Sequence, residues 1–212
     1  MAGPLERESE KTGENEKKKK KRDVEDMRDR GNHLTHHSKK ESTTLPPPTT
    51  HWKPPDRGTW KLNFDGAMRK DIGAAGVGVV VRDHQGQAIA ALTKRFHLPQ
   101  TPAMIEALAA REAIQLALEL KLNRVSLEGD SATIIKELCC SESNFTPHGH
   151  IIEEIQDKSK SFHSCSFQHT RRPANTVAHV LAQKSFSFDS HFLWLTAMPH
   201  DVISFLQSDL VH

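Results

Sequence analysis

Residues 60–67 alternate apolar with polar side chains and end in a turn that contains Gly66, a pattern that predicts a β-strand. A run of small and β-branched residues predicts a second strand at about 75–83. A third strand is predicted at about 88–96, after the turn 84–87. The connections between these strands are too short for parallel crossovers, so we predict an antiparallel meander.

Helical periodicity begins at residue 101. Thr101 is expected as the N-cap and Pro102 in the first turn of a helix. The apolar stripe of this helix consists of Ile105, Leu108, Ala109, Leu116 and Leu120. The remaining pattern predicts a strand at 124–128, a helix capped by Asp130 and Ser131 that runs to about 140, a helix near 149–161, a strand near 163–169 and a helix from 173 to about 188.

These elements follow the order βββαβαβα, with an extra helix between the fourth and fifth strands. The helix between the third and fourth strands allows the fourth strand to pair in parallel with the first. We therefore predict an α/β domain, built on one five-stranded mixed sheet with helices on both faces. The predicted organisation is an arm at 1–50, the domain at 51–190 and a C-terminal extension at 191–212.

The arm is predicted to be disordered, because its charged residues and its Pro-rich end offer almost no apolar side chains to bury. It holds 12 of the 29 Lys and Arg residues and 10 of the 27 Asp and Glu residues, so the remainder is formally neutral. A neutral body argues against tight, indiscriminate binding of nucleic acids. The basic run Lys17-Lys18-Lys19-Lys20-Lys21-Arg22 has three interpretations: a nuclear-localisation signal, an electrostatic tether to nucleic acid, or a solvated charge cluster.

The cysteines and the apolar segments bear on where the protein acts. Three cysteines, of which Cys139 and Cys140 are adjacent, predict reduced thiols in an intracellular protein rather than a disulfide framework. The chain has no signal-like apolar run at its start and no apolar run long enough to cross a bilayer. We expect a soluble protein without a membrane partner, and the pattern leaves its oligomeric state open.

Three acidic residues stand where this order of elements would bring them together. Asp65 lies near the end of the first strand, and Asp130 lies just past the end of the fourth, its expected parallel neighbour. Glu106 lies one turn into the first helix, on a face of small residues turned toward the sheet. These small residues are Ala110, Ala113 and Ala117. A buried anion is costly unless it is compensated, and Mg²⁺, which prefers oxygen ligands, would compensate it.

Each acidic residue also has an ordinary structural interpretation. Asp130 would cap the helix that follows it. Asp65 would be a turn aspartate before Gly66. Glu106 would interact favourably with the dipole at the start of its helix. The combination of the three in one place favours a metal site.

Several motifs extend over about two-thirds of the chain. They are Trp52-Lys53-Pro54-Pro55 with Gly58, then 61–67, 75–83 with Gly86, 106–109, 128–131 and 169–182. In this order and spacing they resemble the ribonuclease H-like domains of plants, which are related to the ribonuclease H part of retrotransposon reverse transcriptases. Trp194 and Pro199 are similar to the C-terminal extension of that family.

The resemblance implies a ribonuclease H-like fold and a metal-dependent endonuclease that hydrolyses the RNA strand of RNA–DNA hybrids. It implies Asp65, Glu106 and Asp130 as catalytic metal ligands. It implies His169 as a histidine that assists nucleophile activation or product departure, although a strand-end histidine packed on a loop is the ordinary interpretation. Asn175 matches a residue near the scissile phosphate, and its ordinary interpretation is a polar residue early in a helix.

The implied mechanism is two-metal hydrolysis of a phosphodiester that leaves a 5′ phosphate and a 3′ hydroxyl. Contacts to the 2′-hydroxyl in the minor groove would select RNA. By proximity to the acidic residues, we expect Gly66, Ala67 and Ser131 to contribute to substrate binding. No small-molecule cofactor is expected.

His179 is the one departure from the family that bears on the chemistry. The family has its fourth carboxylate four residues after this asparagine, and no acidic residue between 170 and 188 replaces it. The second metal site therefore lacks a hard oxygen ligand. We expect His179 to be a weak ligand, because imidazole suits Mn²⁺ or Zn²⁺ better than Mg²⁺.

The sequence leaves two other functions open. The first is a catalytically weak or inactive module that binds hybrid or structured RNA, which His179 and the neutral body favour. The second is a protein-interaction domain of transposon origin. A transposase or integrase on the same fold is disfavoured, because it would need an acidic residue on a late helix and the helix predicted at 173–188 has none.

Overall fold

A computed structural model of the chain describes residues 51–97, 101–140, 142, 144–195 and 197–210. The predictions for the arm at 1–50, its basic run included, lie outside the described residues. None of the helices in the described ranges combines the length and the apolar character that crossing a bilayer requires.

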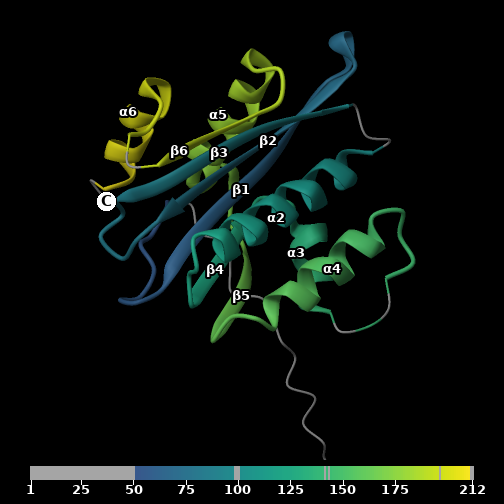
Figure 1. The fold of residues 1–212 in the computed structure, drawn as a ribbon, viewed down its shortest axis with the longest axis horizontal. Helices are drawn as coiled ribbons and strands as arrows, with labels where there is room; N and C mark the ends of the chain where they lie inside the picture. Colours follow the sequence, from purple (N-terminus) through teal and green to yellow (C-terminus); the bar gives the residue numbers. More distant parts are fainter. Residues whose placement is uncertain (1–50, 98–100, 141, 143, 196, 211–212) are drawn as a thin grey trace, which may run out of the picture. The chain divides into compact units, whose positions relative to one another are not determined.

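The centre of the fold is a mixed sheet in which the strands follow the order β5-β4-β1-β2-β3-β6 (Figure 1). β1, β2 and β3 form the antiparallel meander that the sequence predicts, and β4 lies parallel to both β1 and β5. The strands are β1 (Trp60–Arg69), β2 (Ala74–Arg82), β3 (Ala88–His97), β4 (Arg124–Gly129), β5 (Ser164–His169) and β6 (His191–Leu195). The predicted fold class is confirmed.

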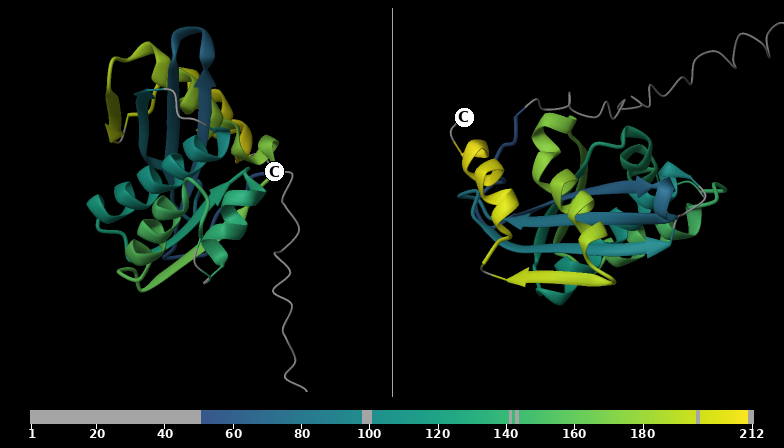
Figure 2. Two further views of the ribbon diagram at one scale, coloured as in Figure 1. Left: turned by 90° about the vertical axis from the view of Figure 1, so that its right-hand side faces the viewer. Right: turned by 90° about the horizontal axis from the view of Figure 1, so that it is seen from above.

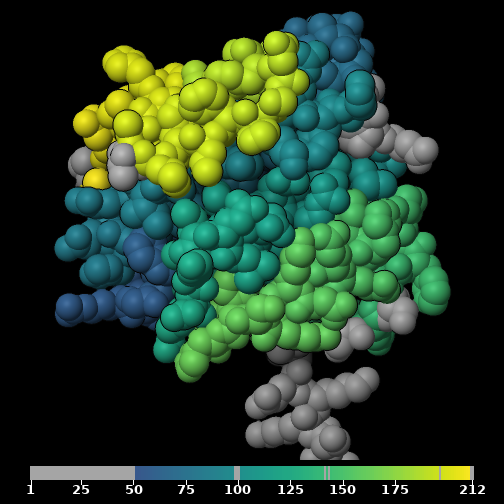
Figure 3. Space-filling view, in the orientation of Figure 1, coloured from purple at the N-terminus to yellow at the C-terminus, as the bar shows by residue number. Residues whose placement is uncertain are grey.

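The sheet has one strand more than the sequence predicts. β6 pairs antiparallel with the outer edge of β3, so part of the segment 191–212 extends the sheet. The space-filling view shows the C-terminal elements, in yellow, against the body that contains the sheet (Figure 3). The five residues of β6 are mostly exposed and mostly apolar in sequence, so they lack the alternation that marks a half-buried strand.

Helices cover both faces of the sheet, as Figure 2 shows from two sides. One face carries α2 (Pro102–Glu119), α3 (Ala132–Cys139) and α4 (Gly149–Ser159), and the other carries α5 (Thr176–Lys184) and α6 (His200–Asp209). Short 3-10 turns, η1 (Lys70–Ile72), η2 (Arg172–Asn175) and η3 (Ser185–Ser187), complete the order. The helix predicted at 173–188 is therefore three consecutive pieces, of which only the middle one is α-helical.

The helix starts show which capping predictions hold. Thr101 caps α2, because its side chain accepts a hydrogen bond of 3.2 Å from the backbone N–H of Met104. The predicted side-chain cap at the start of α3 is wrong. Ser131 is the N-cap residue there, but its side chain makes no capping hydrogen bond. Asp130 lies one residue further out, which leaves its carboxylate available for other partners.

Two glycines let the helices approach the sheet beside the acidic residues. A Cβ atom at Gly66 in β1 would lie 3.0 Å from the side chain of Ile105 in α2. A Cβ atom at Gly78 in β2 would lie 2.3 Å from the carbonyl oxygen of Ala178 in α5. Both helices are thus seated close to the part of the sheet that holds Asp65, which pairs with Gly78.

Candidate metal centre

Strand geometry places Asp65 and Asp130 side by side. Side chains alternate along β1, so Asp65 lies on the same face as Asn63. β1 and β4 run parallel with Asn63 opposite Glu128, so two residues further on Asp65 reaches the level of Asp130. Asp65 is almost fully buried, whereas Asp130 is half-buried at the end of its strand.

Glu106 completes the cluster from helix α2. One carboxylate oxygen from each of Asp65, Glu106 and Asp130 lies within 4.8 Å of the other two. The structure therefore brings together the three acidic residues that the sequence places 65 positions apart at most. The small residues predicted beneath Glu106, which are Ala110, Ala113 and Ala117, are fully buried.

The electrostatics of the cluster favour a cation. Burial, and then the negative charges of Asp65 and Asp130, raise the pKa of Glu106 to about 9. Burial, and then Asp65, also raise the pKa of Asp130. Oxygen Oε2 of Glu106 is buried and has no hydrogen-bond partner in the described part of the chain. A divalent cation with oxygen ligands would satisfy this atom and remove the repulsion, so the residues present fit Mg²⁺ or Mn²⁺.

His179 lies at the cluster, where the resemblance implies the fourth ligand. Its Nδ1 is 2.7 Å from Oδ2 of Asp65, and its side chain is 32% exposed. This hydrogen bond raises the pKa of the imidazole, against the opposing effect of burial. In this bond Nδ1 donates to the carboxylate oxygen of Asp65, so Nδ1 itself cannot ligate a cation while the bond is made.

His169 lies at the end of β5, next to Asp130. Its Nε2 is 3.1 Å from the backbone carbonyl oxygen of Asp130. Because a carbonyl oxygen only accepts, Nε2 is the donor in this bond, and Nδ1 is the ring nitrogen that can act as an acceptor. The position beside the acidic cluster is the one that the sequence interpretation requires.

Asn175 is buried at the start of α5. The residue is 1% exposed, and its side-chain amide donates a hydrogen bond of 2.9 Å to the carbonyl oxygen of Phe64. This bond ties Asn175 to the peptide group before Asp65, and the role near the scissile phosphate that the resemblance implies stays a prediction. Gly66, whose N–H donates to the Glu106 carboxylate, and Ser131, which follows Asp130, do border the cluster.

The sequence predicts no role for two polar residues that lie at the site. Arg172 lies with Nε 3.8 Å from Oδ2 of Asp130, and its side chain is 69% exposed. Asn63 is fully buried two residues before Asp65 and joins several elements through its carboxamide. Asn63 lies between two apolar residues in a predicted strand, and this position could have indicated a buried polar side chain.

Comparison with known proteins bears on the family and the fold of the chain. Residues 63–185 match the family described as reverse transcriptase-like. The chain is also 28% identical over 158 residues to an Arabidopsis thaliana protein named as a ribonuclease H protein. That alignment covers 74% of this chain but only 25% of the relative, so the chain spans about a quarter of the relative's length.

Solved structures share the fold. RNase H1 from the halophilic archaeon Halobacterium salinarum is 25% identical, with a TM-score of 0.57 over 61% of this chain and 98% of that one. LC11-RNase H1, solved in complex with an RNA/DNA hybrid, is 21% identical, with a TM-score of 0.55 over 60% of this chain and 96% of that one. The resemblance found in the motifs is thereby confirmed, and the chain belongs to the reverse transcriptase-like family, with a domain of the ribonuclease H-like type.

Proposed function

We propose that the chain is a divalent-metal-dependent nuclease that hydrolyses the RNA strand of RNA–DNA hybrids. The observation that carries the proposal is the buried oxygen Oε2 of Glu106, which has no hydrogen-bond partner among the described residues and lies in the cluster with Asp65 and Asp130. Family membership supports the reaction, and the shared fold of LC11-RNase H1, which was solved with an RNA/DNA hybrid, supports the substrate.

The residues of the cluster take different roles in this proposal. Asp65, Glu106 and Asp130 are the metal ligands. A bound cation would polarise a phosphoryl oxygen and lower the pKa of a bound water. His169 accepts a proton at Nδ1 while its Nε2–H remains bonded to the Asp130 carbonyl. The hydroxyl of Ser131 and the backbone of Gly66 and Ala67 are proposed to contact the substrate, where a 2′-hydroxyl would select RNA.

The experiment is cleavage of a duplex whose RNA strand carries a label. The full chain should cut the RNA–DNA hybrid in Mg²⁺ or Mn²⁺ to products with 5′ phosphate and 3′ hydroxyl ends. It should leave double-stranded DNA intact, and a chelator should abolish the cleavage. Equal cutting of hybrid and DNA duplexes would contradict the proposed specificity, and cutting that persists with the chelator would contradict the metal requirement.

One observation favours a second candidate function, a module that binds hybrids with little turnover. His179 stands where the resemblance implies the family's fourth carboxylate, and its Nδ1 is engaged with Asp65, so a second cation would lack an oxygen ligand there. Binding of uncut hybrid in Mg²⁺, without products after long incubation, would select this candidate over the nuclease.

Replacing His179 with Asp is expected to raise Mg²⁺-dependent activity by about tenfold, which is the lower end of the effects of metal-site partners. The change supplies an oxygen ligand and removes the proton-bearing ring beside Asp65. The measurement is kcat as a function of Mg²⁺ concentration. His150→Asp, the same change at an exposed position of α4, is the control and should leave the profile unaltered. An unchanged profile for His179→Asp would mean that this position does not contribute to metal binding.

A further inference from the structure

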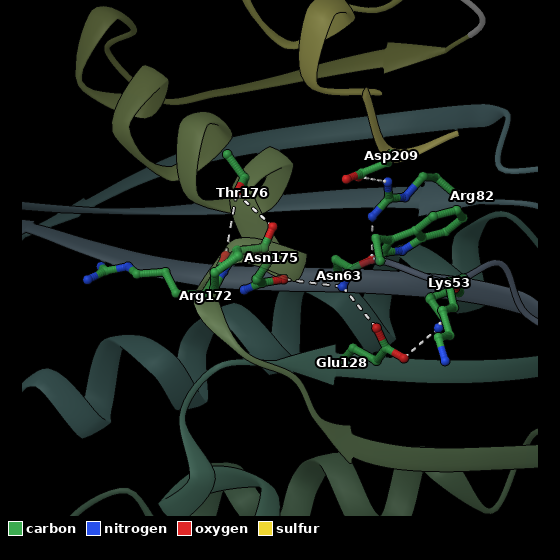
Figure 4. A network of polar contacts seen from close by, with 11 residues as sticks. Lys53, Asn63, Arg82, Glu128, Arg172, Asn175, Thr176 and Asp209 are labelled. Carbon is green, nitrogen blue, oxygen red and sulfur yellow. Dashed lines mark hydrogen bonds and ion pairs between the residues drawn. The ribbon is translucent and has the colours of Figure 1, made fainter. Parts of the chain in front are cut away.

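A buried polar network joins both ends of the described chain to the strand that carries Asp65 (Figure 4). From it we infer that Trp52 and Asp209 are positioning residues of the candidate metal centre and act on it through Asn63. The effect on catalysis that we infer rests on the proposed function. The hydrogen bonds and ion pairs of the network do not depend on that function.

Asn63 is the hub of the network. Its Oδ1 accepts hydrogen bonds from Nε1 of Trp52 at 2.9 Å and from Nη2 of Arg82 at 2.8 Å. Its Nδ2 donates to Oε2 of Glu128 and to Oδ1 of Asn175, each at 3.2 Å. The indole and the guanidinium can only donate, so they determine which way the carboxamide faces. All four hydrogen-bonding capacities of the group are thus used.

One branch of the network leads to the peptide group before Asp65. Since Oδ1 of Asn175 accepts from Asn63, its Nδ2 is directed to the carbonyl oxygen of Phe64, 2.9 Å away. That carbonyl belongs to the peptide bond that Asp65 completes. Asn175 also ends the η2 turn, one helical turn before His179 in α5. The hub therefore sets the position of β1 relative to the helix that bears His179.

A second branch leads to β4. Glu128 accepts from Asn63 and forms an ion pair of 2.6 Å with Lys61, and both charged side chains are buried. Lys61 in turn donates to the backbone carbonyl of Lys53 at 2.7 Å. Glu128 lies two residues before Asp130, which directly follows the last residue of β4, so this branch holds the strand that presents the second carboxylate.

The opposite side of the hub leads to the C-terminal helix. Arg82 is 1% exposed, lies 3.7 Å above the ring of Trp52 and forms an ion pair of 2.6 Å with Asp209, the last residue of α6. Burial lowers the pKa of Arg82 to about 10, so the side chain is still a cation at neutral pH. Asp209 supplies its counter-charge from outside the stretch that matches the family, which ends at residue 185.

The network can be disturbed without detaching α6. The helix is also held by Val202, which is fully buried in a separate apolar cluster with Val80, Val177 and Leu181. Losing the Asp209 charge would leave this packing intact but would leave Arg82 without its partner. Arg82 would then hold the carboxamide of Asn63 less firmly, and a reversed carboxamide would place its oxygen against the Glu128 carboxylate. The result would be a displaced Asp65 in a folded protein.

The test compares three variants of the full chain. Asp209→Asn removes the charge that faces Arg82, and Trp52→Phe removes the donor to Asn63 while it keeps an aromatic ring beneath Arg82. Asp201→Asn is the matched control, because Asp201 lies in the same helix and pairs with Lys184 on the surface. Mn²⁺ affinity is measured by calorimetry at a temperature at which circular dichroism shows each variant to be folded.

We expect both network variants to weaken Mn²⁺ binding by about tenfold, within the range for residues that orient metal ligands, while the control keeps the wild-type affinity. In cleavage assays kcat should fall and the KM for hybrid should stay unchanged. Wild-type affinity in the folded network variants would overturn the inference. If Asp209→Asn fails to fold, the Mn²⁺ affinity of Trp52→Phe decides whether the inference holds.

A metal-free readout separates this inference from the proposed function. The amide resonance of Asp65 reports on the peptide group that Asn175 binds, so it should move in both network variants and not in Asp201→Asn. If the wild-type chain binds no Mn²⁺, the metal-dependent function fails and this shift alone tests the network. An Asp65 resonance that stays in place in Trp52→Phe overturns the positioning role.

Discussion

Replacing Asp65 with Asn will reduce hybrid cleavage by about a thousandfold or more, equivalent to about 4 kcal/mol of transition-state stabilisation. Asn keeps an oxygen of similar shape but loses the charge that lies within 4.8 Å of Glu106 and Asp130. In the proposed function Asp65 is a metal ligand, and because its side chain is buried, water has little access to take the place of the lost charge. The measurement is kcat/KM for a labelled RNA–DNA hybrid in Mg²⁺ and in Mn²⁺.

The matched control for this substitution is Asp71→Asn. Asp71 is exposed in η1 and forms its ion pair with Arg69, away from the cluster. We expect this variant to cleave the hybrid as the wild type does. If Asp65→Asn and the wild type show equal activity, the cleavage comes from another source and the nuclease assignment is wrong.

The metal-free protein will lose stability as the pH rises from about 5 to about 9, and Glu106→Gln will suppress that loss. In the folded chain burial and the neighbouring carboxylates raise the pKa of Glu106 to about 9, against an ordinary value of 4.5. Between these two values the folded state keeps a proton that the unfolded state has released. Stability therefore falls with increasing pH, by up to about 1.4 kcal/mol per pH unit for this group.

A divalent cation should reverse this dependence. Bound metal replaces the proton as the compensating charge, so Mg²⁺ or Mn²⁺ should raise the melting temperature more at pH 8 than at pH 6. Glu106→Gln keeps the shape of the side chain but removes its charge. This variant should be more stable than the wild type at pH 8 without metal, and it should gain little from added metal.

The measurement is thermal or urea unfolding of wild type and variant across this pH range, with and without metal. Glu119→Gln makes the same change at the exposed C-terminal end of α2 and should leave the pH dependence as it is in the wild type. A metal-free wild type whose stability stays level or increases from pH 6 to pH 8 would contradict the raised pKa of Glu106.

The positions of the secondary-structure elements follow from local patterns. The alternation at 60–67 and the cap at Thr101 depend on residues a few positions apart, which is why the predicted and observed bounds of β1 and α2 agree closely. β6 was missed because it is a short, exposed edge strand whose partner, β3, lies about 100 residues earlier. An isolated run of this length carries no periodicity that distinguishes a strand from an irregular segment.

The convergence of Asp65, Glu106 and Asp130 was predictable because topology alone supplies it. Parallel neighbours in a sheet have their C-terminal ends at the same edge. The helix α2 follows β3, which runs in the same direction as β1, so its first turn begins at that edge as well. The chemical state of these groups was not predictable. The pKa of Glu106 depends on its burial and on the distances among the carboxylates, which no spacing in the chain specifies.

The sequence by itself determined the order of the elements from β1 to α5, the fold class and the three acidic residues of the candidate site. Only the tertiary structure decided the partners of those residues: the bond between His179 and Asp65, the buried Asn175 and the hub at Asn63. The bond between Asn63 and Asn175 and the ion pair between Arg82 and Asp209 join residues 112 and 127 positions apart. Hydrogen bonds and ion pairs require distances and directions correct to a fraction of an ångström, and such precision arises only when the whole domain has packed.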